Sequence, residues 1–129
     1  MIVIDSSAIV AILNNEAEAD DFSAMVLRHE TIIGAPNVLE TVMVLSREYQ
    51  AQSSAQVNRF LAASAIAVVP FDETQLDMAA VAFLKYGKGR HPAGLNFGDC
   101  MAYALAKSMR LPLLFKGDDF ALTDIERAV

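Results

Sequence analysis

Acidic side chains stand at four places in this sequence from which they could share one site. Asp5 ends an apolar run at the start of the chain, Glu40 and Asp99 lie near the starts of two predicted helices, and Asp118 and Asp119 follow a late apolar run. Carboxylates that lie close together repel one another unless a cation comes between them. Magnesium prefers oxygen ligands, and a carboxylate-bound metal can hydrolyse a phosphodiester bond without a histidine base. These residues therefore predict divalent-cation chemistry on a phosphodiester.

Two of these acids also have a simpler interpretation as helix caps. Asp5 is followed by two serines and would make a good N-cap. Asn96 and Asp99 have the spacing of a capping box, and Asp99 would lie in the first helical turn, where the helix dipole favours an ionised carboxylate. Gly98 is harder to explain in this way, because glycine in a helix costs about 1 kcal/mol relative to alanine. We expect some group to approach the backbone closely at Gly98.

The other acids are informative only through their surroundings. Glu40 has Met43 and Val44, rather than a basic residue, at the neighbouring helical positions. It would take part in the site if its helix faced Asp5 and Asp99. Asp118 and Asp119 are adjacent, so their side chains diverge and we expect only one of them to point into the site. A turn with an N-cap is the simpler interpretation of that pair.

Other kinds of catalytic site are absent from the sequence. There is no zinc-type cluster of His and Cys, no Gly-rich phosphate loop with Lys and Ser or Thr, and no G-x-S-x-G motif. Cys100 is the only cysteine, which excludes an internal disulfide and a thiolate zinc cage. A metal site in this chain must therefore use oxygen ligands.

The charge balance limits how the chain could contact nucleic acid. The formal net charge is -6 and the sequence pI is about 4.7, so the molecule as a whole lacks the basic field of a nucleic-acid binder. One local basic stretch contains Lys85, Lys88, Arg90 and His91, shortly before Asp99. It is either a local contact for RNA or a solvated loop.

The elements that must position the acids alternate between short β-branched runs and longer helical patterns, which is typical of a parallel α/β sheet. The predicted strands are residues 2–5, 31–34, 66–70 and 113–115. The predicted helices are residues 6–13, 16–29, 36–49, 53–63, 74–86 and 96–109, with a partly helical tail. Ligands of such sheets bind beyond the carboxyl ends of the strands, where Asp5 and the Asp118–Asp119 pair would lie.

Length and composition predict one domain that does not act alone. The 129 residues fit a single domain over residues 1–129, with no linker-like stretch. Hydrophobic residues make up 54% of the chain, more than one small core readily buries, so we expect self-association or a bound partner. The longest nearly apolar run, residues 62–71, is too short to span a bilayer, and the first residues lack a basic lead-in and reach Asp5 where a signal peptide would have its apolar stretch. We therefore expect a cytoplasmic protein without a membrane segment.

The motifs around the acids resemble those of the PIN-domain nucleases, and most closely their VapC toxin branch. They are Ile-Asp-Ser-Ser-Ala at Asp5, Pro-Asn-Val-Leu-Glu at Glu40, Asn-Phe-Gly-Asp-Cys at Asp99, and Lys-Gly-Asp-Asp-Phe in the tail. The resemblance covers essentially the whole chain, and its most specific part is the run from His91 to Cys100.

This resemblance implies a fold, an activity and partners. The fold would be a three-layer αβα arrangement around a mostly parallel sheet of 4–5 strands, and the protein would be a homodimer. The activity would be Mg²⁺- or Mn²⁺-dependent endoribonuclease cleavage of RNA. A VapB-type antitoxin would neutralise the toxin, and operator DNA would be bound only through the toxin–antitoxin complex.

The resemblance also assigns roles to residues. Asp5 and Asp99 would be the principal metal ligands, and Glu40 would hold the metal or a metal-bound water. Ser7 would steady Asp5. Similar toxins often have Asn-Asp-Phe in the tail, so Asp119 aligns better than Asp118 with the fourth acid. Lys85, Lys88 and Arg90 remain the candidates for drawing in the RNA backbone.

Three other kinds of protein fit parts of the pattern. Haloacid-dehalogenase-like phosphatases and receiver domains also place magnesium-binding acids at strand ends. The former need an Asp where this chain has Ser7, and the latter need an Asp at the end of the third strand, where Asp72 is a poor match. An inactive PIN-like scaffold that binds RNA or a partner is the non-enzymatic alternative. Retention of every acid argues against it, because an unused anionic cluster only lowers stability.

Overall fold

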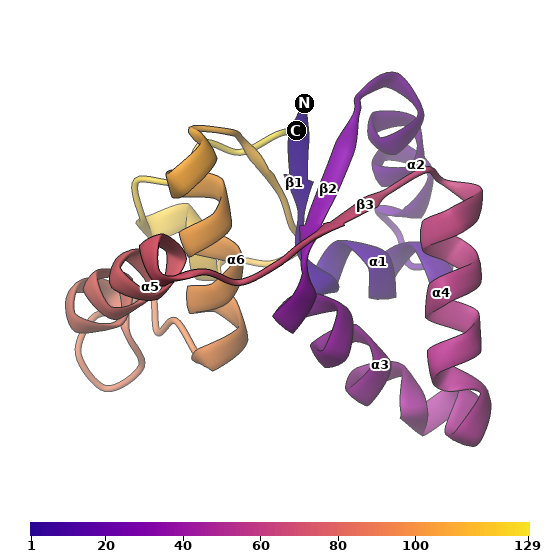
Figure 1. Cartoon of the computed structure of the whole chain (residues 1–129), viewed down its shortest axis with the longest axis horizontal. Coiled ribbons are helices and arrows are strands. Elements are labelled where there is room, and N and C mark those ends of the chain that lie inside the picture. Colours follow the sequence, from indigo (N-terminus) through magenta and orange to yellow (C-terminus); the bar gives the residue numbers. More distant parts are fainter.

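The structure is a computed structural model that describes residues 1–129, and a four-stranded parallel sheet forms its centre (Figure 1). The strands are β1 (Ile2–Ile4), β2 (Thr31–Gly34), β3 (Ala67–Val69) and β4 (Leu113–Leu114), in the order β3-β2-β1-β4. Val3 of β1 lies opposite Ile32 of β2 on one side and Leu113 of β4 on the other. The first strand of the chain therefore lies beside the last one.

Helices make the crossovers that parallel strands require. They are α1 (Ser6–Leu13), α2 (Ala19–Arg28), α3 (Ala35–Tyr49), α4 (Ser53–Ala63), α5 (Glu73–Tyr86) and α6 (Phe97–Met109), with the short 3-10 helices η1 (Gln50–Gln52) and η2 (Asp119–Leu122). In Figure 1, α1 to α4 lie on one side of the strands, and α5 and α6 lie on the other. None of these helices is both long enough and apolar enough to cross a membrane.

Two apolar cores lie on opposite faces of the sheet, because successive side chains of a strand point to opposite faces. Val3 and Ile32 belong to the core that contains α5 and α6. Ile2, Ile4 and Ile33 belong to the core that contains α1, α2 and residues of α3 and α4. The predicted α/β class and the three-layer αβα arrangement are therefore confirmed.

The predicted elements all form, and the differences lie at their ends. The largest is in the second helix, which was predicted from residue 16 and begins at Ala19. Asn15 has a φ of 51°, and the N–H of Glu16 donates to the carbonyl of Ala11. This tight turn satisfies the end of α1, so the chain needs three more residues before it can start a new helix.

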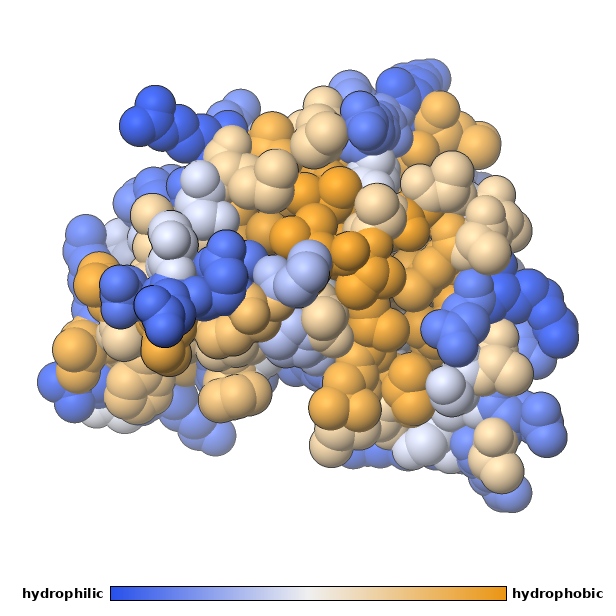
Figure 2. Space-filling view, viewed as in Figure 1, coloured by the Kyte–Doolittle hydropathy of each residue, from blue (hydrophilic) through white to orange (hydrophobic).

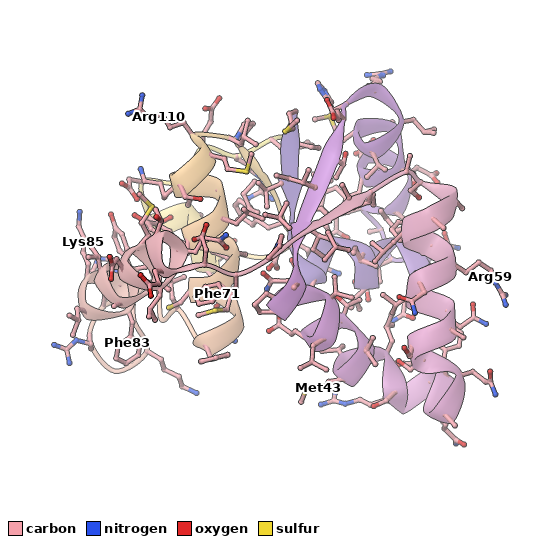
Figure 3. The ribbon with its side chains drawn as sticks, in the orientation of Figure 1. Met43, Arg59, Phe71, Phe83, Lys85 and Arg110 are labelled. Atoms are coloured by element: carbon pink, nitrogen blue, oxygen red, sulfur yellow. The ribbon has the colours of Figure 1, made fainter.

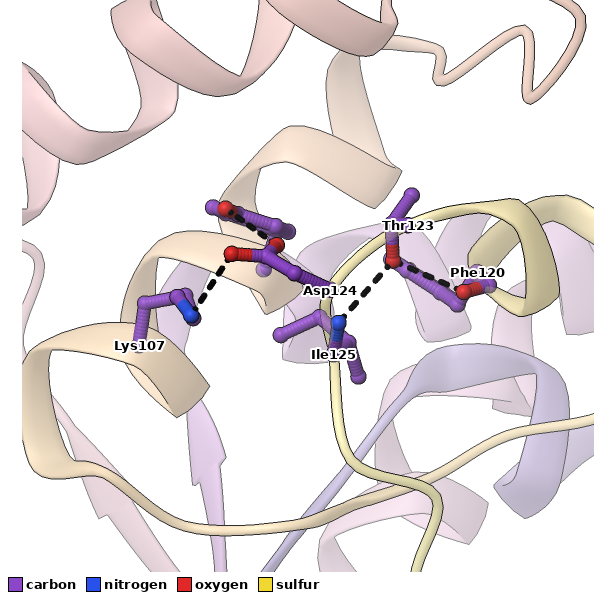
Figure 4. Close-up of polar contacts among 6 residues, drawn as sticks. Lys107, Phe120, Thr123, Asp124 and Ile125 are labelled. Carbon is purple, nitrogen blue, oxygen red and sulfur yellow. Dashed lines mark hydrogen bonds and ion pairs between the residues drawn. The ribbon is translucent and has the colours of Figure 1, made fainter.

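The tail that follows β4 is fastened to α6 (Figure 4). The hydroxyl of Tyr103 donates to Oδ1 of Asp124 at 2.7 Å, and Nζ of Lys107 donates to Oδ2 at 2.9 Å. Burial alone would raise the pKa of Asp124, but the hydrogen bonds from Lys107 and Tyr103 outweigh it and hold the pKa below its usual value. The tail is thus held by side chains as well as by its backbone.

Candidate active site

The candidate acids lie at the edge of the sheet where β1 and β4 end. Asp5 follows β1 and is the N-cap of α1, and Asp99 lies in the first turn of α6. Glu40 lies in the second turn of α3, and Asp119 opens η2. Asp5 and Asp99 are only 3% and 8% exposed, which is unusual for acidic residues that have no basic partner.

Asp5 is held in one orientation through a single oxygen. Its Oδ2 accepts hydrogen bonds from the backbone N–H of Ser7 at 3.1 Å and from the Ser7 hydroxyl at 2.6 Å. The N–H of Lys116, just beyond β4, donates to that same hydroxyl at 3.0 Å. The other oxygen, Oδ1, is buried and has no hydrogen-bond partner. Ser7 therefore steadies Asp5 and leaves Oδ1 available to a ligand.

Asp99 forms the predicted capping box with Asn96. The N–H of Asp99 donates to Oδ1 of Asn96 at 2.8 Å, and the N–H of Asn96 donates to Oδ2 of Asp99 at 3.0 Å. The cap therefore exists, but it does not replace a role in the site. The capping box fixes the Asp99 carboxylate at the N-terminus of α6 through Oδ2.

Glu40 reaches across from α3 to the start of α6. Its Oε1 accepts hydrogen bonds from the Ser6 hydroxyl at 2.5 Å and from Nδ2 of Asn37 at 3.1 Å. A Cβ atom placed on Gly98 would lie 1.8 Å from Oε2 of Glu40. The close approach that was predicted at Gly98 is therefore made by the carboxylate of Glu40.

Sequence reasoning missed the two residues that hold Glu40. Ser6 looked like part of a helix start, and Asn37 is a buried amide, 1% exposed, that also donates to the carbonyl of Gly98 at 3.0 Å. The available signal was the spacing of Asn37 and Glu40, three residues apart on one helix, which places their side chains on the same face.

The acids form a row in which each charge affects the next. Burial raises the pKa of Asp5 to about 6; the hydrogen bond from Ser7 opposes this, and the charge of Glu40 adds to it. Burial likewise raises the pKa of Asp99 to about 7; the N–H of Asn96 opposes this, and the charges of Asp5 and Asp119 add to it. The site is therefore more stable when a proton or another cation is bound to Asp5 and Asp99 than when both carboxylates are ionised and unpaired.

The tail contributes Asp119 to this row. Both tail acids are exposed, and Asp119 adds to the raised pKa of Asp99 through its charge and a side-chain hydrogen bond. Asp118 is the N-cap residue of η2 and makes no side-chain hydrogen bond to it. That only one of the two acids acts in the site remains a prediction.

The basic stretch makes no ion pair with these acids. Lys85, Lys88 and Arg90 are exposed on the end of α5 and the loop that follows it. Lys85 lies on the outer side of α5, away from the sheet (Figure 3), with its ammonium 5.0 Å from the Tyr86 ring centre. Nε of Arg90 donates to the carbonyl of Leu84 at 3.2 Å.

The donor set fits a hard divalent cation held by few protein ligands. No group of three or more His, Cys, Asp or Glu side chains is arranged as a metal cage. Magnesium often takes only one or two carboxylates and completes its shell with water and substrate oxygens. The unpartnered Oδ1 of Asp5, next to the buried Asp99, matches this requirement.

The contact between Glu40 and Gly98 predicts an unusual mutant pair. Gly98→Ala in the wild type should not stabilise the fold, because the new methyl group displaces Glu40 from Ser6 and Asn37. In a Glu40→Ala background the same change should raise the free energy of unfolding, by up to about 1 kcal/mol, through helix propensity. Urea denaturation of the four proteins measures both effects. Equal stabilisation in both backgrounds would show that Glu40 does not occupy this space.

The raised pKa of Asp99 predicts a loss of stability with rising pH when no metal is present. Its pKa is 3.8 in an unfolded chain and about 7 in the folded one, so the folded state binds the proton more tightly. This contribution to stability is complete below about pH 4 and is lost as the pH rises to about 7. Asp99→Asn cannot ionise and should lose less stability between about pH 5 and pH 8. Thermal melts in chelator test this, and identical pH profiles for the two proteins would contradict it.

The comparisons with known proteins agree with this geometry. The profile of the PIN domain family matches residues 2–126. The chain is 43% identical over 124 residues to Ribonuclease VapC30 of Mycobacterium tuberculosis, a match that covers 95% of each chain. It is 42% identical over 124 residues to Ribonuclease VapC of Mycolicibacterium smegmatis, covering 95% of this chain and 96% of the relative.

Two solved structures share the fold at low sequence identity. One is the Mycobacterium tuberculosis toxin VapC20, described as cleaving the sarcin-ricin loop, with a TM-score of 0.78 at 14% identity over 97% of this chain and 96% of that one. The other is a toxin–antitoxin complex from Klebsiella pneumoniae, with a TM-score of 0.72 at 14% identity over 96% and 93% of the two chains. The profile match and the near-full-length identities show that this chain belongs to the PIN-domain family, among the VapC ribonuclease toxins of toxin–antitoxin systems.

Proposed function

We propose that this ribonuclease is a metal-dependent endoribonuclease that hydrolyses RNA phosphodiester bonds with Mg²⁺, or Mn²⁺, held by Asp5 and Asp99. The observation that carries the proposal is the buried Oδ1 of Asp5, which has no hydrogen-bond partner. A buried carboxylate oxygen without a partner is costly, and a hard cation relieves it together with the raised pKa of Asp99. The chain provides no Lys or Arg ion pair to either acid.

Each residue of the row has a separate task in this proposal. A bound divalent ion would stabilise the charge that develops on the phosphate and would make water more acidic. Ser7 occupies Oδ2 of Asp5 and leaves Oδ1 without a hydrogen-bond partner. Ser6 and Asn37 hold Glu40 through hydrogen bonds to its Oε1. Glu40 and Asp119 flank the pair of ligands and orient the attacking water.

The proposed RNA contacts are of two kinds. The reacting phosphate lies at the acidic row. Lys85 lies at the end of α5, and Lys88 and Arg90 lie in the loop that follows it. In this proposal the three side chains bind phosphates farther along the RNA. Phosphate contacts of this kind position the RNA without reading its sequence.

Cleavage of defined RNAs by the purified protein tests the proposal. Wild type should cleave with Mg²⁺ or Mn²⁺ and stop in chelator, while Asp5→Asn and Asp99→Asn should each lose more than about 100-fold, because the cation loses a ligand. Asp119→Asn should lose more activity than Asp118→Asn, and Asp20→Asn, on the exposed start of α2, should match wild type.

Two results would contradict the proposal. Cleavage that persists in chelator, or in Asp99→Asn, would refute the assigned metal site. RNA binding without cleavage under any metal would favour the alternative of a catalytically inactive scaffold.

The partners follow from the family. As a VapC toxin, the protein is neutralised by an antitoxin. We propose that this antitoxin is of the VapB type, that operator DNA is bound only through the complex, and that the protein acts on RNA in the cytoplasm.

We also propose that the protein is a homodimer. Figure 2 shows apolar surface across the middle of one face, over β3, and at its lower edge, over α3. Leu39, Met43 and Phe97 are 61%, 64% and 78% exposed, and they line a cleft of about 500 Å³ between α3 and the start of α6. Monomeric soluble proteins rarely expose apolar surface of this kind, and a stable interface needs about 800 Å² per partner.

A charge placed in this cleft should separate the dimer. Met43→Glu should sediment as a monomer at concentrations where wild type is a dimer, because a carboxylate would be buried at the contact. Leu27→Glu is the matched control, since Leu27 is 86% exposed on α2 and lies outside the cleft. A wild-type monomer, or equal masses for all three proteins in sedimentation equilibrium, would rule out this interface.

A further inference from the structure

One face of α6 carries three polar side chains at intervals of four residues. Asp99 belongs to the acidic row, and Tyr103 and Lys107 follow it one and two turns later. Tyr103 and Lys107 together hold the two oxygens of Asp124, at 2.7 and 2.9 Å (Figure 4). We call Tyr103, Lys107 and Asp124 the tail clamp. The helix that carries one acid of the site therefore also anchors the tail.

The clamped segment carries Asp119. Only four residues separate Asp119 from Asp124, and two contacts stiffen them. Phe120 is 2% exposed and lies with its ring centre 5.0 Å from that of Phe115. The Thr123 hydroxyl donates to the carbonyl of Phe120 at 2.7 Å and accepts from the N–H of Ile125 at 3.2 Å. A displacement of Asp124 would therefore be passed on to Asp119.

The position of Asp119 in the acidic row depends on this anchor. Asp119 is exposed and shares a side-chain hydrogen bond with Asp99, which requires a proton between the two carboxyl groups. When a metal replaces that proton both groups are ionised and repel each other, so their own interaction no longer keeps them near each other. Asp99 is fixed because it is part of α6. Asp119 is joined to α6 through the buried ring of Phe120 and through the short segment that Asp124 ties down.

We propose that Tyr103, Lys107 and Asp124 are positioning residues that set the separation of Asp119 from Asp99 and thereby tune the affinity of the acidic row for its divalent cation. This inference rests on the proposed function, because it needs Asp119 to act in the cation site. A simple fastening of the chain end would stabilise the fold without affecting the cation.

Manganese binding to the RNA-free protein, measured by calorimetry, tests the clamp without relying on cleavage. Tyr103→Phe removes one hydroxyl and keeps the ring, and we expect about 10-fold weaker binding, as for other outer-shell partners of metal sites. Tyr86→Phe is the matched control. Its ring lies in the same core, 6.0 Å from that of Tyr103, but its hydroxyl makes no hydrogen bond, so affinity should not change.

A double-mutant cycle separates positioning from fastening. Asp119→Asn alone should weaken manganese binding, and adding Tyr103→Phe to it should have no further effect, because the clamp acts through Asp119. Equal losses in both backgrounds would show that Tyr103 acts on the site by another route and would overturn the proposal. Lys107→Gln is a second clamp variant, in case Tyr103→Phe does not fold. The Lys107 side chain is 37% exposed, so its replacement should not disturb the core, and it should also weaken manganese binding, by a smaller factor.

The outcomes distinguish this inference from the proposed function. If Asp119→Asn weakens manganese binding and neither Tyr103→Phe nor Lys107→Gln does, the clamp is refuted and the metal site stands. If wild type binds no manganese, or Asp119→Asn binds it as wild type does, the assignment of Asp119 to a metal site fails, and the clamp fails with it.

Discussion

Negative charge buried without a basic partner is the constraint on which the rest of this site depends. Asp5 and Asp99 lie inside the protein with raised pKa values, and Glu40 and Asp119 add charge on either side. The fold tolerates this because Asp5, Asp99 and the half-buried Glu40 each receive hydrogen bonds on one oxygen: from Ser7, from the N–H of Asn96, and from Ser6 with Asn37. A second oxygen of Asp5 has no such partner. A cation bound at this point would recover the stability that the unpartnered charges cost.

The scaffold compensates with two ordinary apolar cores. The parallel sheet brings the ends of β1 and β4 together, and the helices that follow or precede them present their N-terminal turns to the same edge. Helix α6 contributes both to the site and to the core. It carries Asp99 in its first turn, while eight consecutive residues from Asp99 to Ala106 are buried. The side chain with the highest pKa of the row thus stands on one of the most firmly packed elements of the molecule.

Much of this could be predicted from the sequence, for identifiable reasons. Short β-branched runs and helical patterns are local, so they located the four strands and six α-helices and erred mainly where the turn at Asn15 delays α2. The rule that ligands meet the carboxyl ends of parallel strands singled out Asp5 and the tail acids. The capping box of Asn96 and Asp99 was also visible, because it lies within four residues.

The contacts that complete the site were not visible, because they join distant segments. Nothing next to Glu40 indicates that its carboxylate fills the space above Gly98, although the glycine itself showed that some group must come close. Ser6 and Asn37 have polar side chains of common types, and only the packing of α3 against α1 and α6 gives them a shared acceptor. The basic stretch is easily seen in the sequence, but its first residue, Lys85, points to the outer side of α5.

The strand order has a consequence for how such a toxin is made. Because β4 pairs with β1, and Asp119 comes after β4, the pocket draws on both the earliest and the latest parts of the chain. Domains begin to fold during synthesis from their N-terminal side, but pairings between such distant segments must wait for the later segment to emerge. A nascent chain still held by the ribosome therefore carries Asp5 and Glu40 without a finished pocket. The acidic row therefore cannot be completed until β4 and the tail have left the ribosome.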